Sequence, residues 1–373
     1  MLSPARAEHI GSLKRPEALL RKRADFGLGK CTAAELRAVE DRCIEDIIKT
    51  QLDLGLPVVT DGEFRSFQEP ILRGVFEKLS GMKELQMPPE HYFQDRIRRV
   101  VPLYADDFDF TKSIVGPEDV AKLKVTMCAP EWLHFRHGPY TYEPSACPND
   151  ADYFADVARV YREEIQDLYR RGCRRIQIDD PIISCFCDAT FRERMTRAGV
   201  DPRRLLDTYF ALYNDCLRDK PEDILVGLHV CRGNIKPDGT PFTQGAYGWI
   251  ADKLFTSLHF DCFYLEYDSE SAGGFEILRY FPRNKRLVLG LVSTKTRELE
   301  DPTSLRERIM QAADVIAHGE DPRPVEEALA QLSISPQCGF ASHSRGFAWV
   351  TREDMMKKLE LVRDVAREVW GDA

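Results

Sequence analysis

The sequence lacks a long apolar run, an excess of positive charge and any low-complexity linker. No segment approaches the roughly 18 consecutive apolar residues that a membrane-spanning helix needs, so we expect no membrane span. The formal net charge is −9, and no basic patch is interleaved with aromatic residues, which argues against a nucleic-acid partner. No stretch rich in Gly, Ser or Pro and no fixed-period repeat divides the chain, so we predict a single domain over residues 1–373.

The motifs of several enzyme classes are missing as well. There is no Gly-x-Gly motif or Ser-His-Asp arrangement in a recognisable context. The N-terminal residues carry no apolar stretch of the kind found in secretory signals. The 11 cysteines are an odd number and do not suggest a disulfide scaffold, so they point to a reducing compartment. We therefore expect a cytoplasmic protein, and the sequence leaves open whether it forms a homo-oligomer.

Short apolar runs alternate with longer amphipathic segments along most of the chain. The predicted strands cover 57–60, 124–128, 175–178, 224–228, 262–265, 286–291 and 332–334, with an eighth piece around His9-Ile10. The predicted helices include 32–54, 150–171, 202–217, 303–318 and 352–370. Strand–helix alternation indicates a parallel sheet, and seven or eight repeats favour a closed α/β fold, the (β/α)8 or TIM barrel.

Two local features refine this expectation. Thr32-Ala-Ala-Glu35 is a capping box that opens one predicted helix, and Thr303-Ser-Leu-Arg306 opens another. The stretch 64–121 is too long for a plain helical crossover and is rich in charged and aromatic residues. We interpret it as an insertion at the mouth of the barrel, with a hairpin as part of it.

Polar residues follow most of the predicted strands. The C-terminal ends of the strands form one face of such a barrel, and active sites lie on that face, so these side chains should meet in one mouth. Taken alone, Asp61-Gly62-Glu63 is better interpreted as a turn with a helix-capping acid, and Asp179-Asp180-Pro181 could likewise be a turn. The residues are Ser12, Asp61 to Glu63, Glu131-Trp132, Asp179-Asp180 and Ser293 to Lys295.

Four candidate metal ligands obey the same rule. His229 and Cys231 end one apolar run, and residues i and i+2 of a strand point the same way. Glu266 and Cys338 follow two later runs. Imidazole, thiolate and carboxylate together suit zinc. His-x-Cys alone is a weak signal, since Cys is often only a small buried hydrophobe.

Other candidate residues have no recognisable partners. Cys185 and Cys187 form a second thiol pair that no nearby ligand completes, so we interpret them as structural. His134, His137 and His343 are expected at the surface or in supporting positions.

In this order, the motifs resemble the catalytic half of cobalamin-independent methionine synthase, and the urogen-decarboxylase-like barrels share its overall organisation. The resemblance runs over almost the whole chain. The matching stretches are His9-Ile-Gly-Ser12, Val59-Thr-Asp-Gly-Glu-Phe64, Ile176-Gln-Ile-Asp-Asp-Pro181, Leu228-His-Val-Cys231, Leu265-Glu266 and Ser335-Pro-Gln-Cys-Gly339.

The resemblance implies a site and a reaction in methionine biosynthesis. It implies a catalytic Zn²⁺ on the four metal ligands above, and homocysteine held by Ser12, Glu63 and Asp179. The backbone from Ile10 through Gly11 would hold the substrate carboxylate. Trp132 would lie against a folate that donates the methyl group. The expected activity is zinc-dependent methyl transfer from a 5-methyltetrahydrofolate-type donor to a thiol, with Asp179 and Lys295 as catalytic residues.

This chain departs from the family pattern in three places. Long family members carry a second, N-terminal barrel, and they have a proton-passing His where Lys295 stands here. The interval from Cys231 to Glu266 is longer, and residues 233–248 look like an added loop. Three alternatives therefore stay open: transfer to another thiol or from another donor, such as epoxide opening; a metal-free decarboxylase; and a non-enzymatic zinc-binding barrel.

Overall fold

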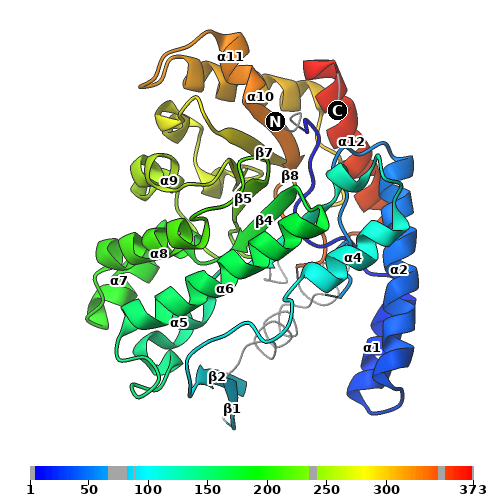
Figure 1. Ribbon diagram of the computed structural model, residues 1–373. Helices are drawn as coiled ribbons and strands as arrows, with labels where there is room; N and C mark the ends of the chain where they lie inside the picture. Colours follow the sequence, from blue (N-terminus) through cyan, green and yellow to red (C-terminus); the bar gives the residue numbers. More distant parts are fainter. Residues whose placement is uncertain (1–4, 66–81, 87–88, 235–241, 343–348, 372–373) are drawn as a thin grey trace.

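The computed structural model describes residues 5–65, 82–86, 89–234, 242–342 and 349–371. Its centre is a parallel sheet with strand order β3-β4-β5-β6-β7-β8 (Figure 1). Each strand coincides with a predicted apolar run to within two residues at either end. The strands are β3 (Lys124–Cys128), β4 (Arg175–Asp180), β5 (Leu225–Val230), β6 (Cys262–Glu266), β7 (Arg286–Val292) and β8 (Leu332–Pro336).

Two irregular segments complete the ring of strands. Residues 5–13 lie beside β8, where the amide of Glu8 donates to the carbonyl of Ile334 over 2.9 Å. On the other side of the sheet, Val59 forms an isolated parallel bridge with Leu123. The two segments meet each other where the amide of Leu13 donates to Gly62 (3.0 Å). The (β/α)8 barrel predicted from the sequence is thus confirmed, with single bridges in place of two regular strands.

Amphipathic helices cover the outside of the barrel. The predicted helices are confirmed, with one correction: α10 is capped by Asp301, whose side chain accepts from the amide of Ser304, so Thr303 lies inside the helix. None of the helices in the described ranges is long and apolar enough to cross a membrane. The helices are α1 (Glu17–Gly27), α2 (Ala33–Asp53), α4 (Ala105–Ile114), α5 (Trp132–His137), α6 (Asp150–Arg171), α7 (Ala189–Arg197), α8 (Pro202–Cys216), α9 (Ala251–Ser257), α10 (Pro302–Ala317), α11 (Val325–Ala330) and α12 (Arg352–Trp370).

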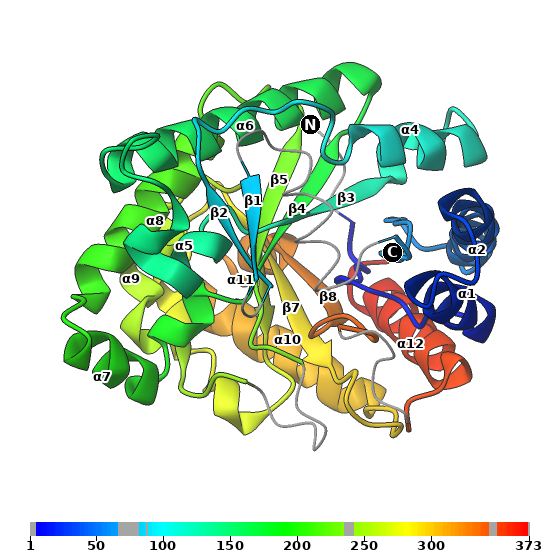
Figure 2. The same ribbon diagram turned by 90° about the horizontal axis from the view of Figure 1, so that it is seen from below.

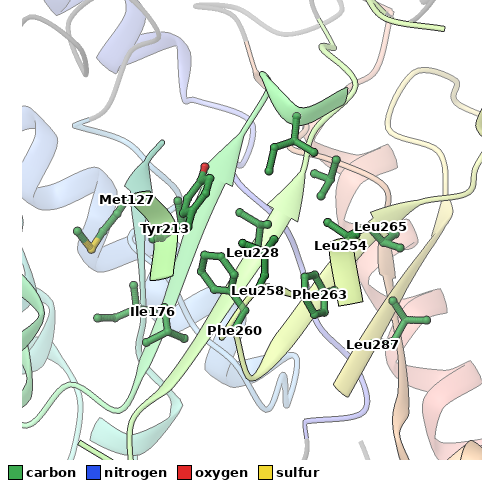
Figure 3. Packing of buried hydrophobic residues seen from close by; sticks show 14 of the residues in the cluster. Met127, Ile176, Tyr213, Leu228, Leu254, Leu258, Phe260, Phe263, Leu265 and Leu287 are labelled. Carbon is green, nitrogen blue, oxygen red and sulfur yellow. The ribbon is translucent and has the colours of Figure 1, made fainter. Parts of the chain in front are cut away.

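The apolar core lies between the strands and the helices. Ile176, Leu228 and Phe263 pack there with residues of α8 and α9 (Figure 3). Successive side chains of a strand point to opposite faces. The neighbours of these outward-facing residues therefore point toward the barrel axis, and His229 is one of them.

The stretch 64–121 contains a hairpin, as predicted, and also a helix. The antiparallel strands β1 (Met82–Gln86) and β2 (Pro89–Phe93) form the hairpin. Phe93 bridges to Tyr142 in the connection that follows β3, so the hairpin lies at the C-terminal end of the barrel (Figure 2). The helix α4 contacts α2 and α6 in the outer layer. Residues 66–81 and 87–88 of the stretch lie outside the described ranges.

Candidate metal centre

The four predicted ligands converge at the C-terminal ends of the strands. One ligand atom of each of His229, Cys231, Glu266 and Cys338 lies within 4.8 Å of the others, and all four residues are buried. The register of the sheet produces this convergence: β5 carries His229 and ends just before Cys231, β6 pairs with β5 and ends at Glu266, and Cys338 follows β8. Residues more than 100 positions apart thus share one pocket.

The donor set and its spacing fit a zinc ion. The Sγ atoms of Cys231 and Cys338 lie 3.6 Å apart, and Nε2 of His229 lies 3.6 Å from Oε1 of Glu266. Two sulfurs at about 2.3 Å from one tetrahedral zinc would lie about 3.8 Å apart. Two thiolates, an imidazole and a carboxylate are ligands that zinc accepts.

Hydrogen bonds orient these ligands. Nδ1 of His229 contacts Oδ1 of Asp179, which leaves Nε2 facing the other ligand atoms. Oε1 of Glu266 accepts from the amide of Arg232 (2.8 Å). A carboxylate behind a ligating histidine is typical of metal sites, because it fixes the ring and its tautomer. Asp179, which the resemblance assigns to substrate, thus already has a contact within the candidate metal site.

Burial and neighbouring charged groups shift the pKa values of two of the candidate ligands. Burial lowers the pKa of His229, but the Asp179 carboxylate outweighs it, and the pKa lies well above the usual value. The hydrogen bond with Cys338, followed by burial, raises the pKa of Cys231. In the metal-free protein, imidazole and thiol therefore hold protons that an incoming cation must displace, so metal affinity should rise with pH.

The predicted substrate residues of the N-terminal segments lie against the Cys338 loop. A Cβ on Gly11 would lie 3.4 Å from the backbone of Gly339 and 3.5 Å from Oε1 of Glu63. Oγ of Ser12 and Oε1 of Glu63 are buried and have no hydrogen-bond partner among the described residues. Buried polar atoms without partners are costly unless a ligand or water satisfies them. These two atoms are therefore available to a bound polar molecule.

Glu63 is unusual in conformation and in charge. Its φ is 56°, in the left-handed region that non-glycine residues rarely adopt, and its amide donates to Oδ1 of Asp61 (2.8 Å). Burial and the negative charge of Asp179 raise the pKa of Glu63 to about 8. Strained backbone and a shifted carboxyl group are both features that concentrate at functional sites.

Lys295 and Trp132 complete the predicted set. Nζ of Lys295 pairs with Oδ2 of the buried Asp268 (3.0 Å). Burial lowers the pKa of Lys295, but the charge and hydrogen bond of Asp268 together with the negative charge of Glu266 outweigh it, and the net shift is upward. Trp132 is the first residue of α5 and is half-buried, and its Nε1 is buried without a partner in the described chain. Asp268 was not predicted from the sequence. It lies two residues after Glu266, just past the end of β6, and other acidic residues of the site also lie at or just past strand ends.

Among the described residues, His134 and the second thiol pair are not part of the four-residue metal cluster. Nδ1 of His134 lies 3.0 Å from the hydroxyl of Tyr209, and its Nε2 pairs with Asp150. Cys185 and Cys187 are buried free thiols. His343 lies outside the described residues.

Comparison with known proteins gives one consistent family. Residues 6–368 match the family of the cobalamin-independent synthase catalytic domain. The uncharacterised protein YxjG of Bacillus subtilis is 35% identical over 98% of this chain and 95% of its own length. A methionine synthase of Saccharolobus solfataricus is 22% identical over 95% of this chain and 94% of its own.

Solved structures agree in fold. A Listeria monocytogenes protein, provisionally described as a vitamin-B12-independent methionine synthase, superimposes with a TM-score of 0.78 at 31% identity, covering 100% of both chains. A B12-independent methionine synthase from Shewanella sp. W3-18-1, in complex with selenomethionine, has a TM-score of 0.67 at 17% identity over 98% of this chain and 97% of its own, which bears on the fold alone. The chain belongs to the family of cobalamin-independent synthase catalytic domains.

Proposed function

We propose that this protein is a zinc-dependent S-methyltransferase that transfers a methyl group to the thiol of homocysteine. The observation that carries the proposal is the convergence of His229, Cys231, Glu266 and Cys338 within 4.8 Å at the mouth of the barrel. Its support is the family of the chain and the fit of this donor set to zinc. When bound there, zinc would supply the positive charge that keeps an incoming thiol deprotonated and nucleophilic at neutral pH.

The residues around the ligands would bind the amino-acid part of the acceptor. Asp179 holds the ring of His229 and would offer negative charge to the substrate ammonium group. Without a substrate Glu63 is protonated, and it would ionise when that cation binds beside it, because a nearby positive charge lowers the pKa of a carboxyl group. Oγ of Ser12 and the backbone amides from Ile10 to Ser12 would hold the substrate carboxylate, a role for which the unpartnered Oγ is suited. This arrangement would fix the sulfur relative to the methyl donor, which is how orientation accelerates a transfer between two substrates.

The donor would bind on the other side of the mouth. Trp132 would stack on a flat 5-methyltetrahydrofolate-type donor. The nitrogen that leaves the methyl group needs a proton. Lys295 would donate it, because Asp268 keeps the ammonium group protonated within the pocket. After transfer, water would return the proton to Lys295.

Metal analysis combined with a product assay tests the proposal. The purified protein is incubated with homocysteine and either 5-methyltetrahydrofolate or its polyglutamylated form, and methionine is quantified. We expect about one zinc per chain, and methionine formation that stops on chelation and returns with added zinc. Cysteine in place of homocysteine is the matched control. Full activity without metal would refute the zinc site, and zinc-loaded protein that yields no methionine from either folate would refute the acceptor–donor pair.

A further inference from the structure

A buried polar network joins the loops that follow β5, β7 and β8. Nδ2 of Asn234 and Nε2 of Gln337 both donate to Oγ1 of Thr294, over 2.9 and 3.0 Å. The amide of Thr294 donates back to Oε1 of Gln337 (2.7 Å). All three side chains are at most 3% exposed. Thr294 is the shared member, and each of its loops carries a residue of the candidate site.

The network holds Cys338 from both sides. Gln337 precedes it, and the amide of Gln337 also donates to the carbonyl of Val292 (2.9 Å). Gly339 follows it, and its carbonyl accepts from Oγ1 of Thr294 and from Nδ2 of Asn234, each over 3.1 Å. The hydroxyl of Thr294 thus donates one hydrogen bond and accepts two, which uses its full capacity.

The same contacts tie Cys338 to the rest of the site. Asn234 lies three residues after Cys231, so its two hydrogen bonds connect the loop of one thiol to the loop of the other. Thr294 directly precedes Lys295. Hydrogen bonds in a buried network are strong and reinforce one another, whereas a partly satisfied network is costly. The loops that carry the two sulfurs are therefore joined to each other by these buried hydrogen bonds.

We propose that Asn234, Thr294 and Gln337 are positioning residues that set the separation of Cys231 and Cys338 and thereby the metal affinity of the site. The proposal rests on the zinc site of the proposed function and adds residues to it that touch neither metal nor substrate. Loss of the central hydroxyl should let the Cys338 loop move away from Cys231. The expected consequence is weaker binding of a thiolate-preferring cation by a protein that is otherwise folded.

The test replaces Thr294, the residue shared by these hydrogen bonds, and compares the zinc affinities of the variants. Thr294→Val keeps the shape and removes the hydroxyl, whereas Thr294→Ser keeps the hydroxyl. Zinc affinity is measured by competition with a chromophoric chelator, and Co²⁺ loading is followed by the sulfur-to-cobalt charge-transfer band. We expect Thr294→Val to bind zinc about 10- to 100-fold more weakly and to alter the cobalt band, and Thr294→Ser to stay near the wild type. Thr111→Val on α4, whose buried hydroxyl donates to the carbonyl of Phe108 in the same helix, is the matched control.

Each outcome separates this inference from the proposed function. If Thr294→Val does not fold, Gln337→Met tests the same network from a second position and should weaken zinc binding in the same direction. Wild-type zinc affinity in folded Thr294→Val and Gln337→Met would overturn the positioning role and leave the zinc site standing. A wild-type protein that binds neither zinc nor cobalt would instead overturn the proposed function and this inference with it.

Discussion

The two sides of the barrel mouth are built in different ways. The candidate metal ligands lie at or just after the ends of β5, β6 and β8, which are strands of the six-stranded sheet. The ladders in that sheet are continuous, apart from one register shift between Gly290 and Val292 where β7 pairs with β8.

Two of the predicted acceptor residues, Ser12 and Glu63, come from segments 5–13 and 57–64, which are tied to the sheet by single bridges such as Ala7–Ile334 and Val59–Leu123. The third, Asp179, lies on β4 and belongs to the sheet. In a hydrogen-bonded strand the ladder fixes the direction of each side chain. In an irregular segment, backbone amides are not used by a ladder and can point, with the side-chain carboxylates, toward a bound molecule.

The two sides also differ in how completely their buried polar atoms are hydrogen-bonded. On the metal side the ligand atoms contact one another or backbone groups: Oε1 of Glu266 accepts from the amide of Arg232, and Nε2 of His229 lies 3.2 Å from the carbonyl oxygen of Gln337. On the acceptor side Ser12 and Glu63 each leave a buried oxygen without a partner, and Glu63 has the strained φ of 56°. Under the proposed function, the metal side would accept an ion with its ligands already oriented, whereas the acceptor side has buried oxygens left for a bound molecule.

The largest effect is expected from Cys338→Ser, which breaks the metal side alone. A hydroxyl is a far poorer zinc ligand than a thiolate, so zinc affinity should fall by on the order of 100-fold or more. Methyl transfer should fall in parallel, because the acceptor thiol loses its stabilising charge. Equilibrium dialysis with zinc and a methionine assay measure the two losses.

A matched control uses a thiol that is buried but remote. Cys216→Ser in α8 changes the same atom away from the mouth and should keep zinc content at the wild-type level. Unchanged turnover in Cys338→Ser would contradict a catalytic zinc at this site, even if zinc still bound elsewhere.

The contrast between the two sides also explains which residues the sequence revealed. His229, Cys231 and Glu266 lie at the ends of apolar runs, so strand periodicity and barrel topology were enough to bring them together. Cys338 follows the same rule after β8. Their neighbours Asn234, Thr294 and Asp268 were not predicted as partners, because side-chain hydrogen bonds between loops leave no periodic signal.

Other differences between the sequence-based predictions and the structure also have local structural causes. Asp179 was assigned to the substrate ammonium by resemblance, whereas its contact with His229 depends on register between β4 and β5, which pairs the two residues. The start of α10 was placed at Thr303, because a Thr can cap a helix as Asp301 does here. The run 57–60 has a strand pattern but makes one bridge, since pattern reports burial and not the number of ladder bonds.

A smaller effect is expected from Gly339→Ala, which acts at the seam between the sides. A Cβ there would lie 2.6 Å from the backbone nitrogen of Ser12 and 2.7 Å from its Oγ, so either the Ser12 segment or the Gly339 loop must move. The segment of Ser12 has fewer ladder bonds and should yield, at a cost of roughly 1–3 kcal/mol. We expect homocysteine binding to weaken more than zinc binding, measured by calorimetry of the zinc-loaded protein.

The control for this change is Gly27→Ala at the end of α1, where a Cβ would meet no atom within 4 Å. It should leave both affinities unchanged. If Gly339→Ala weakens zinc binding more than homocysteine binding, the loop of Cys338 is the segment that moves. The metal side would then be the less rigid of the two sides.

At pH 5 the smallest effect is expected from Glu63→Gln, and this effect grows only as the pH rises. In the folded metal-free protein Glu63 keeps its proton up to a pKa of about 8, whereas in the unfolded chain it ionises near 4.5. Unfolding between these values therefore releases a proton, so the contribution of Glu63 to stability is complete below about pH 4.5 and is lost as the pH rises through 8. The amide of Gln mimics the neutral acid and has no such dependence.

The melting temperature of Glu63→Gln relative to the wild type should therefore increase as the pH is raised from 5 to 8.5. A difference of one pKa unit corresponds to about 1.4 kcal/mol, or about 2 °C in a protein of this size. Glu17→Gln, on the exposed face of α1, is the control and should keep a constant offset. If the offset of Glu63→Gln is constant as well, the acid is ionised in the folded protein, and the acceptor side is already solvated before any substrate binds.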